Sequence, residues 1–339
     1  MRYNLVHNLL SVVTNRNYIP YFHFSPALDD FVKGKPKHVL KYYVRKDLRR
    51  PKDLTQKFDF CWAKKDSKRI YYEHPLAFGY SAKILLDMTD NEYSLSVNPF
   101  YNSFIKFRFE NVWSPGQHFS GLVEIKLLQE GILTFHCASF SDKKTHNGYL
   151  LFGASNTGKS YTVFNAVKKG YQYHSEDLTL LDDSFIYTLP TISVNSKNLP
   201  QKDLLLKLHL FIISRLFINL LIPRFYTTNS YKKFVEGIDV KSRSKLRKIF
   251  ILERGQGGLK KLTSNEAFNK ILLLNRIELS YYKDHLFRSY AYFNDNLDIE
   301  KLYDFETNLT KKLIEQCECY IVSSNNPDDY FPLIEEVIT

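Results

Sequence analysis

The stretch Gly153-Ala154-Ser155-Asn156-Thr157-Gly158-Lys159-Ser160 has the spacing G-x-x-x-x-G-K-S and decides the fold of the chain around it. It follows the apolar run 149–152 and precedes a helical pattern over 159–169. Such a loop turns successive backbone N–H groups inward, and the helix that follows adds the positive end of its dipole. We therefore predict a nucleotide phosphate-binding loop in which Lys159 reaches the β and γ phosphates and Ser160 offers a hydroxyl to Mg²⁺.

Two adjacent carboxylates, Glu176 and Asp177, come one helix and one strand after this loop. In a strand–helix–strand unit the return strand brings its carboxyl end back beside the phosphates. One carboxylate can then hold Mg²⁺ while the other accepts a proton from an attacking hydroxyl. The alternative is a plain turn between strands, because Ser-Glu-Asp is also favourable turn sequence.

The pattern of apolar residues divides the chain near residue 120. Before it, period-two alternation predicts strands, and turn residues separate them. After it, strands and helices alternate. The predicted strands before the division are 68–72, 93–97 and 104–109. The predicted elements after it are helix 122–129, strands 132–135, 149–152 and 171–175, the hairpin 178–181 and 185–189, strand 248–252, helices 264–275 and 298–316, and strand 319–322. We predict an α/β (or α+β) protein with a β-rich domain over 1–120 and a P-loop domain over 121–339.

Composition narrows the class of protein. The 339 residues are 44% hydrophobic and 24% charged, which is an ordinary globular balance and argues against a disordered chain. Four unevenly spaced cysteines make no disulfide framework, and the N-terminus has no signal-peptide core, so we expect a reduced, cytoplasmic setting.

The apolar segment 204–222 carries Lys207, Arg215 and Asn219 on one helical face, which predicts an amphipathic helix and not a transmembrane segment. Packing on the core or on another subunit is expected, with membrane-surface docking as the alternative.

Positive charge is concentrated in two segments of a chain whose net charge is +11. Segment 33–69 has 14 Lys and Arg against four Asp, and segment 232–261 has ten against three acidic residues. The first segment predicts docking of a polyanion such as an acidic protein, RNA or a charged glycan, with a solvated face as the alternative. The second segment offers the basic residues of 241–248, and Arg254 after them, as partners for a transferred phosphoryl group, with a solvated basic loop as the alternative.

The stretch from His136 to Asp177 resembles the catalytic core of the HPr kinase/phosphorylase-like family, whose P-loop fold is related to that of phosphoenolpyruvate carboxykinase. In that family a His at a strand end precedes a G-x-S-G-x-G-K-S loop, a helix, a Gly, and two adjacent Asp six and seven residues later. Here His136 takes the His position, and Gly170 ends the helix six residues before Glu176. The matching loop positions are Gly153, Ser155, Gly158, Lys159 and Ser160. Segment 249–255 also resembles a late strand of many HPr-kinase-like proteins.

The resemblance implies a role for each matched side chain. Glu176 or Asp177 would be the base that activates an acceptor hydroxyl, and the other would orient Mg²⁺. His136 would lie beside the γ phosphate and the base, whereas the residues alone favour a structural histidine there. Asn156 replaces the family's middle glycine, and Glu176 replaces its first Asp. Because Asn tolerates left-handed backbone best after Gly, we expect the loop to form.

These observations predict an ATP-dependent kinase that uses Mg²⁺ and phosphorylates a hydroxyl, on a serine of a protein or peptide or on a small molecule or glycan. The alternative is a nucleotide-binding regulatory or assembly protein that transfers no phosphate. Carboxykinase-type chemistry would need further metal ligands of His and Lys type, which the sequence does not offer. Because members of the family often form rings, a homo-oligomer is a further expectation.

Overall fold

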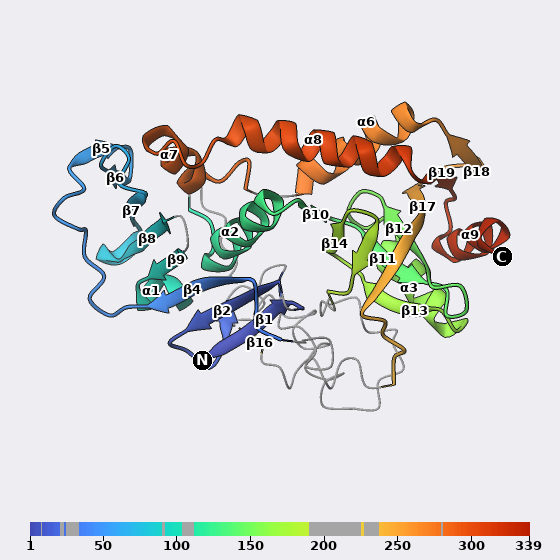
Figure 1. The fold of residues 1–339 in the computed structure, drawn as a ribbon, viewed down its shortest axis with the longest axis horizontal. Coiled ribbons are helices and arrows are strands. Elements are labelled where there is room, and N and C mark those ends of the chain that lie inside the picture. Colours follow the sequence, from blue (N-terminus) through green and yellow to red (C-terminus); the bar gives the residue numbers. More distant parts are fainter. Residues whose placement is uncertain are drawn as a thin grey trace. The chain divides into compact units, whose positions relative to one another are not determined.

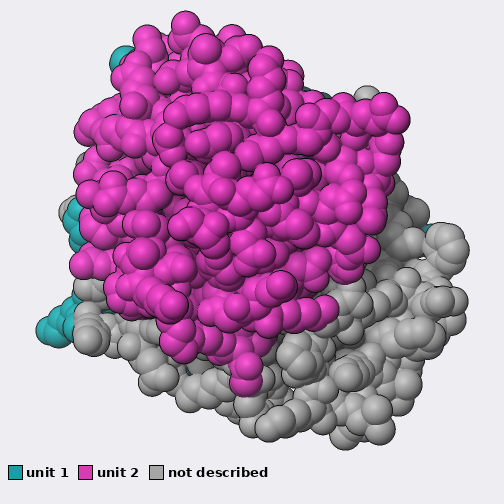
Figure 2. All heavy atoms as spheres, turned by 90° about the vertical axis from the view of Figure 1, so that its right-hand side faces the viewer, with its two compact units in different colours: residues 1–126, 216–231, 280–302 teal, residues 127–215, 232–279, 303–339 magenta. Residues whose placement is uncertain are grey.

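The computed structural model describes residues 1–7, 9–20, 24, 34–89, 92–103, 112–189, 225–226, 237–278 and 281–339. The chain forms two compact units, which are coloured separately in Figure 2. Unit 1 comprises residues 1–126, 216–231 and 280–302, and unit 2 comprises 127–215, 232–279 and 303–339. Each unit contains a large mixed sheet, so the fold class is α/β, as predicted. The strand expected at 104–109 and the helix expected at 204–222 lie outside the described residues.

Unit 1 is built on an eight-stranded sheet in the order β1-β2-β4-β9-β8-β7-β6-β5 (Figure 1). Its strands are β1 (Arg2–Val6), β2 (Leu10–Thr14), β4 (His38–Val44), β5 (Gln56–Phe58), β6 (Cys61–Ala63), β7 (Arg69–Pro75), β8 (Ser81–Thr89) and β9 (Glu92–Val97). A further short pair is β3 (Ile19–Pro20) with β16 (Phe225–Tyr226). Strand β8 alternates buried and partly exposed residues, the pattern of a sheet with one face in the core. The predicted strands 68–72 and 93–97 are confirmed as parts of β7 and β9.

Three helices accompany this sheet: α1 (Pro99–Ser103), α2 (Pro115–Gln129), which continues into unit 2, and α7 (His285–Phe293). Helix α7 contacts β6 and β7, which explains why residues 280–302 belong to unit 1. Gly121 lets α2 approach α7 closely, since a Cβ at this position would lie 2.6 Å from the Phe287 ring of α7. The buried His118 Nδ1 lies 2.6 Å from Asp284 Oδ2, and Asp284 also caps the start of α7. This buried pair therefore joins the start of α7 to α2.

The described part of basic segment 33–69 lies on β4 to β7 and their connections. Arg49 and Lys52 are exposed, whereas Arg50 and Lys57 flank the Trp62 ring at 5.5 and 5.4 Å from its centroid. Part of the positive charge therefore packs on an aromatic ring of its own unit. Docking of a polyanion on this segment stays a prediction.

Unit 2 is built on a nine-stranded sheet whose main path is β10-β14-β15-β17-β12-β11-β13, with β19 beside β17 and β18 beside β19 (Figure 1). Its strands are β10 (Ile132–Phe135), β11 (Ala138–Ser141), β12 (Asn147–Phe152), β13 (Gln172–Ser175), β14 (Thr179–Asp182), β15 (Phe185–Tyr187), β17 (Arg243–Glu253), β18 (Gly258–Leu262) and β19 (Glu318–Ser323). Its helices are α3 (Lys159–Lys168), α6 (Ser264–Glu278), α8 (Ile299–Glu315), which begins in unit 1, and α9 (Tyr330–Ile338). Every strand and helix that was predicted after residue 120 and falls within the described residues is present.

The P-loop strand β12 has parallel neighbours only on one side. Strands β12, β17 and β19 run parallel to one another, so their carboxyl ends share one edge. On the other side β11 is antiparallel to β12 and to β13, which makes β13 parallel to β12 but not adjacent to it. The predicted strand–helix–strand unit β12-α3-β13 therefore exists, with β11 inserted between its strands. Helix α3 contacts β11 and β13, and α9 packs on α3.

Strands β10, β11, β13 and β14 form a long antiparallel ribbon with a bend in the middle. The last pair of one half is Phe135 with Thr179, and the last pair of the other half is Ser139 with Ser175. Residues 136–137 and 176–178 cross the bend in opposite directions. Two or three residues span at most about 10 Å, so both links are held close together. Hydrogen bonds of hydroxyl groups hold the two links together. Thr179 Oγ1 donates to Cys137 O at 3.0 Å, and Ser139 Oγ lies 2.7 Å from Ser175 Oγ.

No helix within the described ranges is both long and apolar enough to cross a bilayer.

Candidate functional site

The backbone of the predicted phosphate loop has the conformation that its glycines allow. Gly153 and Gly158 have φ of 155° and 116°, values that strain any residue with a Cβ. Asn156 has φ of 66°, the left-handed conformation that we expected Asn to accept in place of Gly. Thr157 Oγ1 donates to Ala154 O at 2.8 Å and closes the loop on itself. The sequence therefore produces a tight turn between β12 and α3, with Ser160 in the first turn of the helix.

Lys159 is folded back under this loop. Its Nζ donates to Gly153 O at 2.7 Å and to Ala154 O at 3.3 Å, and only 7% of the residue is exposed. Burial lowers the pKa of Lys159, while the nearby negative groups, Asp177 first and then Glu278, raise it by less. A buried ammonium that bonds to two carbonyls of its own loop can exchange them for phosphate oxygens without crossing open solvent.

A pH titration of nucleotide affinity tests this view of Lys159. Because its pKa is lowered, the lysine loses its proton, and hence its attraction for phosphate, at a lower pH than an ordinary lysine. We expect affinity to fall at a pH below the ordinary lysine pKa of about 10.4, as measured with a fluorescent nucleotide. Lys159→Arg keeps its charge over this range and should show no such decline. Equal slopes for the two proteins would contradict this account.

His136 and Asp177 meet at the bend of the ribbon, one on each link. His136 Nε2 lies 3.0 Å from Asp177 Oδ1. The Lys159 ammonium and the Asp177 carboxylate interact electrostatically. Both charges also act on the pKa of the buried Cys137 thiol. The structure therefore brings His136, Asp177 and the P-loop lysine into one neighbourhood, although 41 positions separate the first two.

The two adjacent acids differ in their surroundings. Glu176 is 1% exposed, whereas the Asp177 side chain is 32% exposed. Ser160 Oγ donates to the backbone carbonyl of Glu176 at 3.5 Å. The first turn of α3 therefore lies directly beside residues 176–178, which we call the acidic link. Of the two carboxylates, Asp177 is the one that an acceptor in solution can reach.

Asn275 on α6 holds His136 in place, and the sequence reading missed it. The backbone N–H of His136 donates to Asn275 Oδ1 at 3.0 Å. The Asn275 amide donates in turn to Thr134 O at 3.1 Å and to Glu306 Oε1 at 2.9 Å. The sequence contained a signal for Asn275, because Ala267, Ile271 and Asn275 recur every four residues on the buried face of a predicted helix. A polar residue in such a stripe must find buried partners.

Two further charged residues, Glu278 and Arg254, lie beside the loop. Ser155 Oγ donates to Glu278 Oε1 at 2.7 Å, at the last residue of α6. Arg254 follows β17 and lines a cavity beside the loop, and its Nη1 donates to Asn325 O at 2.8 Å. The Glu278 contact had no signal in the sequence.

The basic run 241–248 is not at this site, and the expectation that it faces the transferred phosphoryl is wrong. Lys245 pairs with Asn147 at the start of β12, whereas Ile251 pairs with Phe152 at the end that leads into the loop. Six residues of strand separate the two points by roughly 20 Å. Only the carboxyl end of β17 faces the loop, so Arg254 is placed there and Lys241 to Lys248 are not.

His174, two residues before Glu176, is fully buried among hydroxyl groups. Its Nδ1 contacts Thr188 Oγ1, and its Nε2 lies 3.0 Å from both Ser141 Oγ and Ser244 Oγ. These contacts connect β13, β11 and β17 inside the unit. The surroundings of His174 are therefore those of a packed, hydrogen-bonded histidine.

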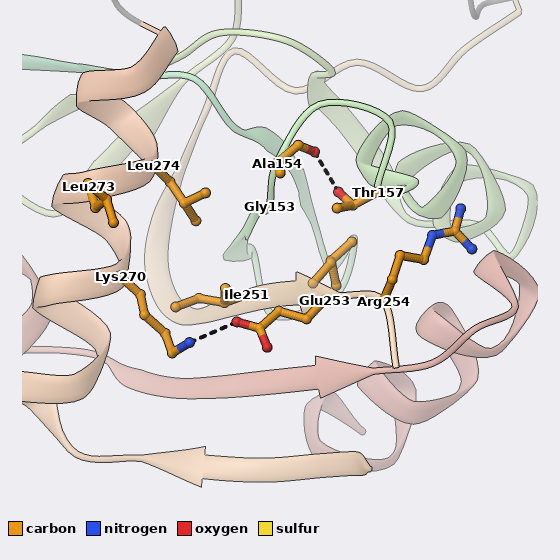
Figure 3. A pocket seen from close by; sticks show the side chains of 10 residues that line it. Gly153, Ala154, Thr157, Ile251, Glu253, Arg254, Lys270, Leu273 and Leu274 are labelled. Carbon is orange, nitrogen blue, oxygen red and sulfur yellow. Dashed lines mark hydrogen bonds and ion pairs between the residues drawn. The ribbon is translucent and has the colours of Figure 1, made fainter. Parts of the chain in front are cut away.

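A cavity of about 510 Å³ opens beside the loop, between the carboxyl end of β17 and helix α6 (Figure 3). Its lining comprises Gly153, Ala154, Thr157, Ile251, Leu252, Glu253, Arg254, Lys270, Leu273 and Leu274. Cavities of this size hold small-molecule ligands. Neither His136 nor Asp177 belongs to the lining, so the cavity and the acidic link lie at different parts of the loop.

Comparison with protein-family models gives no match, and comparison with curated proteins finds no relative.

Proposed function

We propose that the chain is an ATP-dependent phosphotransferase that moves the γ phosphate to a hydroxyl acceptor. Its site comprises the loop 153–160 with His136 and Asp177. The observation that carries the proposal is the 3.0 Å contact of His136 Nε2 with Asp177 Oδ1, beside the buried Lys159. A phosphate loop alone indicates only nucleotide binding. A reachable carboxylate oriented by a histidine adds the group that a hydroxyl acceptor needs.

In this proposal Asp177 is the general base. Its carboxylate takes the proton of the acceptor hydroxyl as that oxygen forms a bond to the γ phosphorus. The bond from the γ phosphorus to the oxygen that bridges to the β phosphate breaks, and ADP leaves with that oxygen. His136 holds the Asp177 carboxylate in position. Lys159 leaves the carbonyls of Gly153 and Ala154 and stabilises the charge on the phosphoryl oxygens.

The residues present fit Mg²⁺ as well. Hard oxygen donors suit this ion, and it binds through one or two protein oxygens together with substrate phosphates. Ser160 Oγ and the acidic link are adjacent, since the hydroxyl contacts Glu176 O at 3.5 Å. With Asp177 as the base, Ser160 and Glu176 would hold the ion, which would neutralise phosphate charge when bound. The described residues contain no cluster of three or more His, Cys, Asp or Glu side chains, so phosphate oxygens would have to complete the shell.

By its resemblance we further propose that unit 2 is a P-loop kinase domain of the HPr-kinase-like type, working in the cytoplasm. The acceptor is a serine of a protein or peptide, or a hydroxyl of a small molecule or glycan. A homo-oligomer remains part of this proposal and is tested by the mass of the protein in solution.

Transfer of label from γ-labelled ATP tests the activity directly. Incubation with candidate acceptors and Mg²⁺ should move label to an acceptor or slowly to water, and Lys159→Ala should abolish the transfer. The competing function is nucleotide binding without transfer. Nucleotide that binds with ordinary affinity but never loses its γ phosphate, with every acceptor class offered, would favour that alternative and reject the kinase.

A further inference from the structure

The cavity beside the loop has a polar end and an apolar wall. Loop residues Gly153, Ala154 and Thr157 form the end next to the phosphate site. Aliphatic side chains of β17 and α6 form the wall, as Figure 3 shows. Leu273 is 63% exposed although it lines this wall. An apolar side chain that borders a cavity and stays open to solvent gains burial when a flat apolar ligand covers it.

The position of the cavity relative to the acidic link decides which part of a substrate it suits. The cavity lies where β17 ends, and Asp177 follows β13, so β12 and β11 separate the two strands in the sheet. Because the acceptor must be in line with the γ phosphate at Asp177, the cavity is left for the opposite end of the nucleotide. That end is the nucleoside.

We propose that this cavity binds the base and ribose of a purine nucleotide, and that the Glu253–Lys270 pair at its border reads the edge of the base. The proposal rests on the function proposed above. Lys270 Nζ lies 2.8 Å from Glu253 Oε1, and the two residues come from α6 and the end of β17. They present a hydrogen-bond donor beside an acceptor, which complements the N1 acceptor and the N6 amino donor of adenine.

Each part of the wall has a separate task in this arrangement. Leu273 and Leu274 on α6 cover one face of the base, and Ile251 on β17 covers the other. Arg254 follows Glu253 on the side nearer the loop and contacts the ribose or the phosphates. The Glu253–Lys270 pair is partly exposed on both sides, so exchanging its hydrogen bonds for those of a base costs little.

Comparison of ATP with inorganic tripolyphosphate separates the nucleoside end from the phosphate end. Leu273→Ala should weaken ATP roughly fivefold and leave tripolyphosphate unchanged, as measured by calorimetry. Ile277→Ala is the matched control, because Ile277 is on the same helix, is 56% exposed, and does not line the cavity. It should change neither affinity. Equal losses for the two variants, or none for Leu273→Ala, would overturn the proposal.

The charged pair is tested through the choice of base. Glu253→Gln and Lys270→Met should each lower the ratio of ATP to GTP affinity, whereas Glu318→Gln should not change it. Glu318 makes a similar ion pair with Lys261 at 2.6 Å, outside the cavity. A ratio that both cavity variants leave unchanged would reject the reading of the base edge.

The two proposals fail in different ways. If tripolyphosphate does not bind the wild-type protein, the phosphate site itself is wrong, and the function proposed above falls. If tripolyphosphate binds as tightly as ATP, the loop works but the cavity contributes nothing. Only the inference about the nucleoside is then rejected.

Discussion

Asp177→Asn is expected to lower the rate of phosphoryl transfer by about 10²- to 10⁴-fold, the usual contribution of a general base. Asn keeps the size of the side chain and an oxygen for the 3.0 Å contact with His136, but it cannot take a proton from the acceptor. Nucleotide affinity measured without Mg²⁺ should not weaken, because the change removes a negative charge near the phosphates and Lys159. Single-turnover transfer and nucleotide titration measure the two effects separately.

Asp183→Asn is the matched control for this substitution. Asp183 lies in the turn between β14 and β15, its side chain is 65% exposed, and its φ of 53° suits Asn as well as Asp. The control should leave transfer within a factor of two or three of wild type. If Asp177→Asn also retains transfer within about tenfold, Asp177 is not the base, and Glu176 becomes the candidate.

Local sequence patterns predicted the parts of the site that depend on neighbouring residues. The loop, the strand before it and the helix after it follow from glycine spacing and apolar runs within about 20 residues. The acids at the end of β13 were also placed correctly by counting one helix and one strand. These features depend on short-range geometry, which sequence periodicity reports well.

The bend of the ribbon could not be predicted in the same way. Strand β11 is only four residues long, Ala-Ser-Phe-Ser, and all four residues are buried. Its alternation of apolar and polar residues is too short to predict a strand by itself. Its pairing with β13 joins residues more than thirty positions apart. The pairings of β10 with β14 and of β11 with β13 together bring the two links with His136 and Asp177 close to each other. The family resemblance, not periodicity, pointed to His136.

The error about the basic run 241–248 has the same origin. Sequence position placed the run 241–248 close to a strand that was expected to matter, but a strand has two ends roughly 20 Å or more apart. Only register settles which end lies by the loop, and register is a long-range property. Asn275 and the lining of the cavity depend equally on how α6 packs, which no local pattern reports.

Gly153→Ala is expected to abolish nucleotide binding, with a loss of affinity of at least about 100-fold. A Cβ at this position would lie 2.6 Å from Thr157 Oγ1 and 2.9 Å from Leu252 O. The Leu252 carbonyl cannot retreat, because β17 is paired with both β12 and β19. Thr157 is held as well, since its hydroxyl donates to Ala154 O at 2.8 Å. The loop must therefore open, and its N–H groups then point away from a common phosphate site.

Gly170→Ala separates this collision from ordinary backbone strain. Gly170 has φ of 96°, so alanine is strained there too, at a cost of about 1–2 kcal/mol in unfolding free energy, but a Cβ would meet no atom within 4 Å. Thermal unfolding should therefore show a loss for both variants, and a nucleotide titration should show a loss only for Gly153→Ala. Normal nucleotide binding by a folded Gly153→Ala protein would mean that phosphate does not depend on this loop. Equal weakening by both variants would assign the effect to general destabilisation. The contrast between the two glycines thus links one close backbone approach, between the loop and β17, to the binding on which every later step depends.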